Sequence, residues 1–220
     1  FRDIQLAFLR ASVMDIEMPT DHAVVAYIYN LANKLGIQYI ISGDNFATEG
    51  VLPNGWSHDK KDLLNIRTIT RQFSGRRIRS LPTLGYFRRH YLVLFKGIKV
   101  VPLLNYMPYD KQLAKEEITK VLAWTDYGAK HGESIFTRFY QNHILPTKFN
   151  VDKRKAHLSA LICSGQMDRA TALSELDQPA YPPELFSSDM ELVTAKLGLT
   201  AQDLATLMSA NGTSTSPAAN

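Results

Sequence analysis

Cysteine is nearly absent from this chain of 220 residues, which contains only Cys163. A single cysteine excludes a disulfide within the chain and a CxxC zinc or redox site. Long apolar runs are also missing: the longest, Tyr91–Lys99, contains Lys96 and Gly97 and falls short of the roughly 20 residues that span a bilayer. The six histidines show no metal-ligand spacing. We therefore expect a cytoplasmic protein without a membrane span or a zinc site.

Positive charge is concentrated in one part of the chain. Between His58 and Val100 there are 11 lysine and arginine residues but only two acidic residues, Asp59 and Asp62. This stretch therefore carries +9, and since the net charge is +4, the remainder carries −5. Such an excess attracts phosphate-bearing partners, which include nucleic acids, nucleotides and nucleotide-linked sugars.

The hydrophobic pattern predicts an α/β protein. A helix capped by Thr20 and Asp21, with an apolar stripe that includes Val24 and Leu35, precedes a short buried strand at Ile37–Ile41. A polar loop follows, as in half of a βαβ unit, and ligands bind at this end of parallel strands. Ile98–Leu104 is the second candidate strand. Because two strands are too few for an independent sheet, we expect the others upstream of Phe1.

The remaining pattern is mostly helical. We expect residues 1–105 to form the second half of a parallel-sheet domain with a basic helical insertion. Residues 106–208 are expected to form a helical region that binds substrate or phosphate, and residues 209–220 a disordered tail. Cys163 is expected to be a small core residue. The predicted helices are Asp59–Phe73, Thr83–Phe95, Asp110–Leu122, Glu133–Ile144, Asp152–Cys163, Asp168–Leu176, Pro183–Leu197 and Thr200–Met208.

The loop after the first strand is the first candidate site. Gly43 permits close approach of a ligand to the backbone, and Asp44, Asn45 and Glu49 have the oxygen ligands that suit Mg²⁺ or ribose hydroxyls. A helix cap followed by a turn explains the same residues without a ligand.

A second candidate lies at a predicted helix start. Two glycines flank Lys130 and His131, and backbone amides beside a lysine suit an anionic group. On the helix, Arg138 lies one turn from Ser134, and Glu133 lies one turn from Thr137. The alternative is a solvated helix face with ordinary capping.

The third candidate spans Lys148 to His157. Asp152 is a predicted N-cap, and Lys153 and Arg154 follow it in the first turn. Cations at this end of a helix oppose its dipole at a cost of a few tenths of a kcal/mol each, and a bound phosphate would reverse that penalty. The conflict favours a phosphate site.

Several strings, in this order, resemble the N-acetyl sugar amidotransferases of bacterial surface-polysaccharide synthesis. Gly36–Glu49 resembles the second half of the ATP-pyrophosphatase fold shared by asparagine-synthetase-like enzymes. The likeness runs from Phe1 to about Met208. The strings are Asp21–Ala23, Gly36–Glu49, Lys99–Tyr106, Asp126–Ser134, Phe136–Gln141, Leu145–Phe149, Asp152–Ser159 and Ser164–Met167.

The resemblance implies an ATP- and Mg²⁺-dependent conversion of an acetamido group on a nucleotide-linked sugar to an acetamidino group. It implies a glutaminase partner that supplies ammonia and a cyclase-like subunit of the histidine-pathway type. On this basis Gly43, Asn45 and Glu49 would contact the nucleotide, and Asp44 and Glu49 the metal. The implied phosphate ligands are Arg138, Lys148, Lys153 and Arg154, and the implied catalytic groups are Lys130, His131 and Glu133.

Two departures from the family pattern affect these expectations. The Ser-Gly-Gly-x-Asp-Ser phosphate loop is absent, so we expect it upstream of Phe1 and expect this chain alone not to hydrolyse ATP. Asp44 stands where the family tends to have a second glycine, which adds a negative charge near the nucleotide.

Two other functions fit the fold and the charge. A tRNA-modifying enzyme of the same fold could use the basic stretch for RNA, although thiolating members generally have catalytic cysteine pairs and this chain has one cysteine. Nucleic acid is therefore the less favoured ligand. The basic stretch could instead dock a non-catalytic module onto an acidic subunit.

Overall fold

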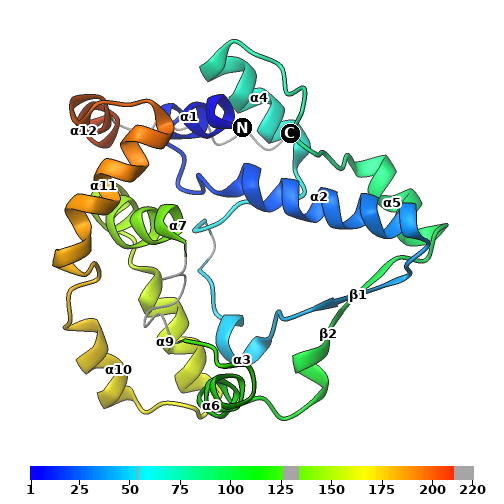
Figure 1. The fold of residues 1–220 in the computed structure, drawn as a ribbon, viewed down its shortest axis with the longest axis vertical. Coiled ribbons are helices and arrows are strands. Elements are labelled where there is room, and N and C mark those ends of the chain that lie inside the picture. The colour runs from blue at the N-terminus through cyan, green and yellow to red at the C-terminus, as the bar shows by residue number, and fades with distance from the viewer. Residues whose placement is uncertain (54, 126–133, 211–220) are drawn as a thin grey trace. The chain divides into compact units, whose positions relative to one another are not determined.

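The structure is a computed structural model that describes residues 1–53, 55–125 and 134–210. The chain divides into two compact units, each built from segments that are distant in sequence. Unit 1 comprises Phe1–Gln38, Gly55–Ile98 and Thr194–Asn220, and unit 2 comprises Tyr39–Asn54 and Lys99–Val193. Figure 1 shows the elements of both units in chain order. No helix in the described ranges has the length and apolar composition that a bilayer crossing requires.

Unit 1 is helical. Ala7 and Phe8 of α1 are fully buried, as is Ile66 of α4, because these two helices pack against each other. Gly75 ends α4 in a left-handed conformation, with φ of 66°, that glycine adopts without strain. The helices within this unit are α1 (Arg2–Arg10), α2 (Met18–Leu35), α4 (Leu63–Ser74), α5 (Tyr86–Leu94) and α12 (Ala201–Ser209).

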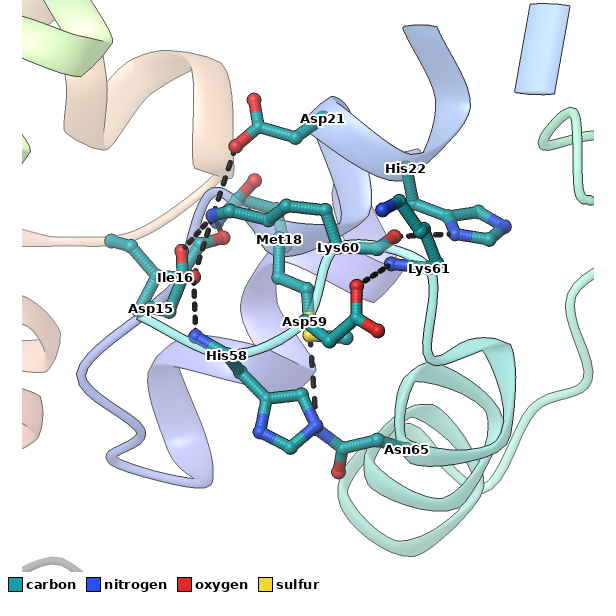
Figure 2. Close-up of polar contacts among 11 residues, drawn as sticks. Asp15, Ile16, Met18, Asp21, His22, His58, Asp59, Lys60, Lys61 and Asn65 are labelled. Carbon is teal, nitrogen blue, oxygen red and sulfur yellow. Dashed lines mark hydrogen bonds and ion pairs between the residues drawn. The ribbon is translucent and has the colours of Figure 1, made fainter. Parts of the chain in front are cut away.

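A buried ion-pair cluster joins the start of α2 to the segment before α4 (Figure 2). The Nζ atom of Lys60 lies 2.7 Å from Oδ1 of Asp15 and 2.9 Å from Oδ2 of Asp21. The Asp15 side chain is only 8% exposed, so Lys60 neutralises a carboxylate that water scarcely reaches. Burial acts to lower the pKa of Lys60, but the two carboxylates outweigh it and the pKa lies above its ordinary value.

His22 makes a second connection in the same region. Its imidazole is 2% exposed. Nδ1–H donates to the backbone oxygen of Lys60 at 2.8 Å, and Nε2 accepts from the N–H of Leu84 at 3.2 Å. Because one nitrogen faces an acceptor and the other a donor, this arrangement requires the neutral tautomer with its proton on Nδ1. His22 thus ties α2 to the segments on both sides of α4.

Two expectations for α2 were wrong. The helix begins at Met18 rather than after Thr20 and Asp21, because Pro19 is well suited to a first turn, where no N–H partner is needed. Its apolar stripe also remains exposed in the described structure: Val24 is 52% and Leu35 is 60% exposed. The helix instead buries a face that includes His22 and Ala26.

Unit 2 contains the predicted parallel pair of strands. In β1 (Tyr39–Ser42) and β2 (Lys99–Pro102) the register pairs Tyr39 with Lys99 and Ser42 with Pro102. Both predicted strands form, and with the helices they give the expected α/β character. The prediction that the first strand is buried was wrong, because Tyr39 and Ile41 are 60% and 63% exposed on this two-stranded sheet. The short helix α3 (Phe46–Glu49) follows β1, and the 3₁₀ turn η1 (Leu103–Tyr106) follows β2.

The rest of unit 2 is helical. Leu158, Leu161 and Ala172 form its apolar cluster where α9 packs against α10, with Met167 beside them. The elements are α6 (Lys111–Leu122), α7 (Ile135–Phe139), η2 (Tyr140–Ile144), α8 (Leu145–Phe149), α9 (Lys153–Cys163) and α10 (Arg169–Leu176), followed by α11 (Pro183–Leu197), which ends in unit 1.

The segment from Ile135 to Phe149 is one helical run containing a π turn, η2. The helix predicted over Glu133–Ile144 therefore ends too early, because the run continues through Pro146. The π turn changes the hydrogen-bond spacing just before Pro146, which has no N–H to donate, and the run continues until Asn150 ends it at φ of 54°.

Several boundaries agree closely with the sequence, but the helix predicted from Asp59 begins at Leu63 and the helix predicted from Thr83 begins at Tyr86. Predicted α11 has the observed bounds, and Asp110, Asp152, Asp168 and Thr200 cap the helices they precede. Cys163 was assigned wrongly: it is exposed rather than part of the core, because α9 turns its last residue away from Leu158 and Leu161. The predicted tail beyond Ala210 lies outside the described residues.

Lys60→Met should lower the free energy of unfolding of unit 1 by about 3 kcal/mol, because it leaves the Asp15 carboxylate buried without its cation. Lys61→Met is the matched control, since Lys61 is exposed. The measurement is urea unfolding monitored by Trp56 fluorescence in a Trp124→Phe background, because Trp56 belongs to unit 1 and Trp124 to unit 2. Equal stabilities of the two variants would contradict the assignment.

Candidate functional site

The carboxyl ends of the two strands place two loops at one edge of the sheet. Ser42 and Pro102 are the last residues of their strands and are directly paired. The loop after β1 is joined to the turn after β2, because Oδ1 of Asn105 accepts from the N–H of Phe46 at 2.9 Å. This is the edge at which open α/β sheets bind ligands.

The first group of predicted site residues lies in the loop after β1. A side chain at Gly43 would meet no atom within 4 Å, so the space beside this backbone is open. Asn45 is the cap of α3, with Oδ1 accepting from the N–H and hydroxyl of Thr48 at 2.8 and 3.0 Å. The Ser42 hydroxyl donates to Asp44 at 2.6 Å. The capping alternative therefore accounts for the Asn45 side chain, and Asp44 and Glu49 remain exposed.

The same loop contains the predicted metal ligands, Asp44 and Glu49. Across the part of the chain that the structure describes, no group of three or more histidine, cysteine, aspartate or glutamate side chains is placed to hold a metal ion. Two carboxylates nevertheless suit Mg²⁺, which usually retains waters and binds substrate phosphates alongside one or two protein carboxylates. The donor set fits Mg²⁺ bound together with a phosphate.

A cleft of about 710 Å³ lies in unit 2 between α6, α9, the end of α10 and the start of α11. Its charged lining contains four cations and three carboxylates. The cations are Lys111, Lys115, Lys153 and Arg154, and the carboxylates are Asp110, Glu175 and Glu184. A volume of this size accommodates a phosphorylated small molecule.

Two long helices present their N-terminal ends to this cleft. Asp110 and Lys111 begin α6, and Lys153 and Arg154 follow the cap of α9. The N-terminal end of a helix carries a partial positive charge. The carboxylates of Asp110 and Asp152 cap these two ends, and Lys111 and Lys153 follow directly, so each end places a cation beside the cleft.

Gln166 holds the two helices in this arrangement. Its side-chain oxygen accepts from the N–H of Lys111, and its side-chain nitrogen donates to the backbone oxygen of Tyr109, both at 2.9 Å. Its own N–H donates to the backbone oxygen of Leu161 on α9, also at 2.9 Å. Burial and the Glu49 and Asp110 carboxylates raise the pKa of the adjacent Tyr109. Gln166 thus links the start of α6 to the end of α9.

Arg154 forms the opposite wall of the cleft. Its guanidinium donates to both carboxylate oxygens of Asp152, at 2.8 to 3.1 Å. It also donates to three backbone oxygens at and beyond the end of α10, those of Glu175, Leu176 and Gln178. These contacts engage all five N–H groups that an arginine has. Arg154 therefore positions α10 against α9, and the neighbouring Lys153 also lines the cleft.

The π turn supplies polar side chains to the same cleft. Gln141 and Asn142 of η2 line it, and Nζ of Lys153 lies 5.5 Å from the centre of the Tyr140 ring. π turns within α-helices occur frequently at functional sites because they redirect a few side chains. Here the turn brings amide groups, which can bind hydroxyls, next to a cation.

Arg138 and Lys148, two other predicted phosphate ligands, do not line this cleft. Arg138 forms a buried ion pair with Asp189 of α11, with Nε and Nη2 lying 2.8 and 2.7 Å from Oδ2. The Tyr181 hydroxyl donates to the same carboxylate. Lys148 is half-buried beside Phe149, and burial lowers its pKa. The buried cluster of Arg138, Asp189 and Tyr181 connects α7 to α11.

The structure thus brings together only part of the predicted site. Lys153 and Arg154 line one cleft with Lys111, Lys115 and His157, which the sequence analysis did not select. The signal that identified Lys153, a cation directly after an aspartate cap, also identifies Lys111. The predicted catalytic residues Lys130, His131 and Glu133 lie outside the described residues, and their roles stay predictions.

One comparison with known proteins gives a match. Residues 133–216 match the family model described as "LPS biosynthesis protein WbpG-like, C-terminal domain". Comparison with curated proteins and with solved structures gives no match. The matched segment begins before α7 and includes α9, α10 and α11, so it supplies most of the cleft lining. This part of the chain is therefore similar to a domain of lipopolysaccharide biosynthesis proteins.

Arg154→Gln should lower the free energy of unfolding of unit 2 by about 2 kcal/mol, because the carbonyl groups beyond α10 and the Asp152 carboxylate lose a charged donor. Lys155→Gln, an exposed neighbour on α9, removes the same charge and should change it by less than about 0.5 kcal/mol. The measurement is urea unfolding monitored by Trp124 in a Trp56→Phe background. Equal effects would mean that Arg154 acts through charge alone.

Tyr181 should make unit 2 sensitive to alkali. Burial and the hydrogen bond to Asp189 raise the pKa of Tyr181 to about 12. The native state therefore favours the neutral phenol, and this stabilisation is complete below the unfolded pKa of about 10 and is lost as the pH rises through about 12.

The difference in unfolding free energy between the wild type and Tyr181→Phe should shrink by about 1 kcal/mol between about pH 9 and about pH 11. Tyr106→Phe serves as the control because Tyr106 is exposed. Unfolding is again monitored by Trp124. A constant difference across this range would show that the Tyr181 phenol does not contribute in this way.

Proposed function

We propose that this chain is the sugar-binding part of an ATP-dependent amidotransferase in lipopolysaccharide biosynthesis. The observation that carries the proposal is the cleft of unit 2, which is lined by three lysines and by the side-chain amides of Gln141 and Asn142 beside its carboxylates and is built largely from the segment that matches the WbpG-like C-terminal domain. The proposed substrate is a nucleotide-linked N-acetyl sugar, whose acetamido group becomes acetamidino.

The lining of the cleft suits the two chemical parts of such a substrate. Lys111, Lys115 and Lys153, at or near helix N-termini, would bind the phosphates. The amides of Gln141 and Asn142 and the carboxylate of Glu184 are groups that hydrogen-bond sugar hydroxyls. Arg154 would keep these groups in place through its contacts with the end of α10.

The proposed reaction overcomes a poor leaving group. The acetamido oxygen attacks the α-phosphorus of ATP, and pyrophosphate leaves. Ammonia then adds to the activated carbon, the carbon–oxygen bond breaks, and AMP leaves with that oxygen. Lys130, His131 and Glu133 are the proposed acid–base groups for these proton transfers. Mg²⁺, held by Asp44 and Glu49, would supply charge stabilisation for the departing pyrophosphate.

The proposal includes the partners that the chemistry needs. A glutaminase subunit would supply ammonia, together with a cyclase-like subunit of the histidine-pathway type. ATP and nucleotide-linked sugars are cytoplasmic metabolites, which places the proposed reaction in the cytoplasm. The loop of Gly43 and Asn45 would contact the nucleotide, and Arg138 and Lys148 remain proposed phosphate ligands outside the cleft.

The test uses the complete encoded protein with ATP, Mg²⁺, isotopically labelled ammonium and a panel of nucleotide-linked N-acetyl sugars. We expect AMP release coupled to replacement of one sugar oxygen by a labelled NH group, followed by mass spectrometry. No AMP with any acetamido sugar, together with tight and salt-sensitive tRNA binding, would instead support an RNA-modifying enzyme.

Lys111→Gln combined with Lys153→Gln should raise the KM for the sugar nucleotide by about tenfold or more, because two phosphate-facing cations are lost. The matched control is Lys155→Gln combined with Lys196→Gln, which removes two cations elsewhere. The measurement is the initial rate of AMP release at varied sugar-nucleotide concentration. An equal rise in the control would show that net charge, and not the cleft, determines affinity.

A further inference from the structure

A second cavity, of about 580 Å³, lies wholly within unit 1. It is formed where the end of α4 and the segment that follows it meet the start of α1. Arginine side chains and hydroxyl groups dominate its polar lining. The polar lining residues are Thr70, Ser74, Arg76, Arg77, Arg79 and Ser80, together with the carboxylate of Asp3.

The three arginines differ in their partners. Arg76 is paired with the Asp3 carboxylate. Arg77 and Arg79 are exposed and form no hydrogen bond or ion pair with any residue in the described ranges. Ile78 between them is partly buried. The segment is therefore anchored by Arg76 and Ile78, and it leaves two guanidinium groups beside the cavity that no carboxylate neutralises.

Two hydroxyl-bearing residues form the wall behind the arginines. Ser74 donates to the backbone oxygen of Thr70 at 2.6 Å and accepts from the N–H of Arg76 at 3.2 Å, which fixes the turn after α4. Thr70 is 2% exposed, and its hydroxyl has no hydrogen-bond partner among the described residues. Thr70 therefore belongs to the buried wall of the cavity, and the groups that a ligand can reach are the exposed guanidinium groups of Arg77 and Arg79.

We propose that this cavity binds a phosphoryl oxyanion through Arg77 and Arg79. Guanidinium groups match the geometry of phosphate oxygens in bidentate contacts. The cavity volume suits a small phosphorylated molecule and is too small to enclose a folded polynucleotide. The site is separate from the unit 2 cleft and does not depend on the proposed reaction.

The experiment measures pyrophosphate binding to the full chain by calorimetry. The background is Lys111→Gln with Lys153→Gln, so that the unit 2 cleft does not contribute heat. Arg77→Gln with Arg79→Gln should weaken binding by about tenfold or more. Arg67→Gln with Arg71→Gln is the matched control, because it removes two exposed arginines of α4 that do not line the cavity. The control should retain the affinity, and circular dichroism should show all variants folded.

Parallel titrations identify the source of the oxyanion. Tighter binding of a nucleoside diphosphate than of pyrophosphate would assign the site to a nucleotide, and the reverse order would assign it to the free anion. Both results support a phosphoryl site. Equal losses in the two arginine pairs, or no binding of either probe while tRNA binds, would overturn the proposal.

Discussion

The geometry of unit 2 depends on one fully bonded guanidinium group, that of Arg154. A helix leaves its last carbonyl groups short of partners, and Arg154 supplies charged donors to those at and beyond the end of α10. Arg154 supplies donors to three of these oxygens and is itself held by the Asp152 carboxylate. The pair with Arg154 also counters the effect of burial on Asp152, whose pKa lies below its ordinary value. One side chain thus determines where the two walls of the cleft lie.

Unit 1 also depends on one cation that joins distant segments, but there the cation is paired with two carboxylates. Lys60 neutralises two carboxylates, and His22 orders the loop that carries Lys60. In both units a charge that would be costly alone is buried with partners from distant segments. Lys60 is paired with two carboxylates, so its charge is already neutralised and cannot bind an anionic ligand. Arg77 and Arg79 have no such partners among the described residues, which leaves them available for a ligand.

Local signals in the sequence predicted local structure well. Asp110, Asp152, Asp168 and Thr200 mark helix starts because their side chains bond to amides two or three residues ahead. The strands at Tyr39 and Lys99 were found from their β-branched composition. Non-local features were not predicted: the π turn before Pro146 and the exposure of Cys163 depend on neighbouring elements. Gln166 also hydrogen-bonds the backbone of Lys111 and Tyr109, which precede it in the sequence by 55 and 57 positions.

The candidate site shows the same limit. Lys153 was identified from its position after a cap, but its companions Lys111 and Lys115 come from another helix, and only tertiary structure brings them together. Arg154 was identified by the same rule and has a different use, since its donors all bind protein oxygens. The sequence shows that a cation stands at the start of a helix. It does not show whether that cation binds other protein groups or a ligand.

The helix α9 connects the two candidate regions of unit 2. Lys153 at its start lines the cleft, and Ser164 just beyond its end donates to the backbone oxygen of Ala47 in α3, at 3.0 Å. An α-helix of 11 residues is a stiff rod about 16 Å long. The distance between the cleft and the strand-end loop is therefore set by the length of α9, because each region is attached to one end of this helix.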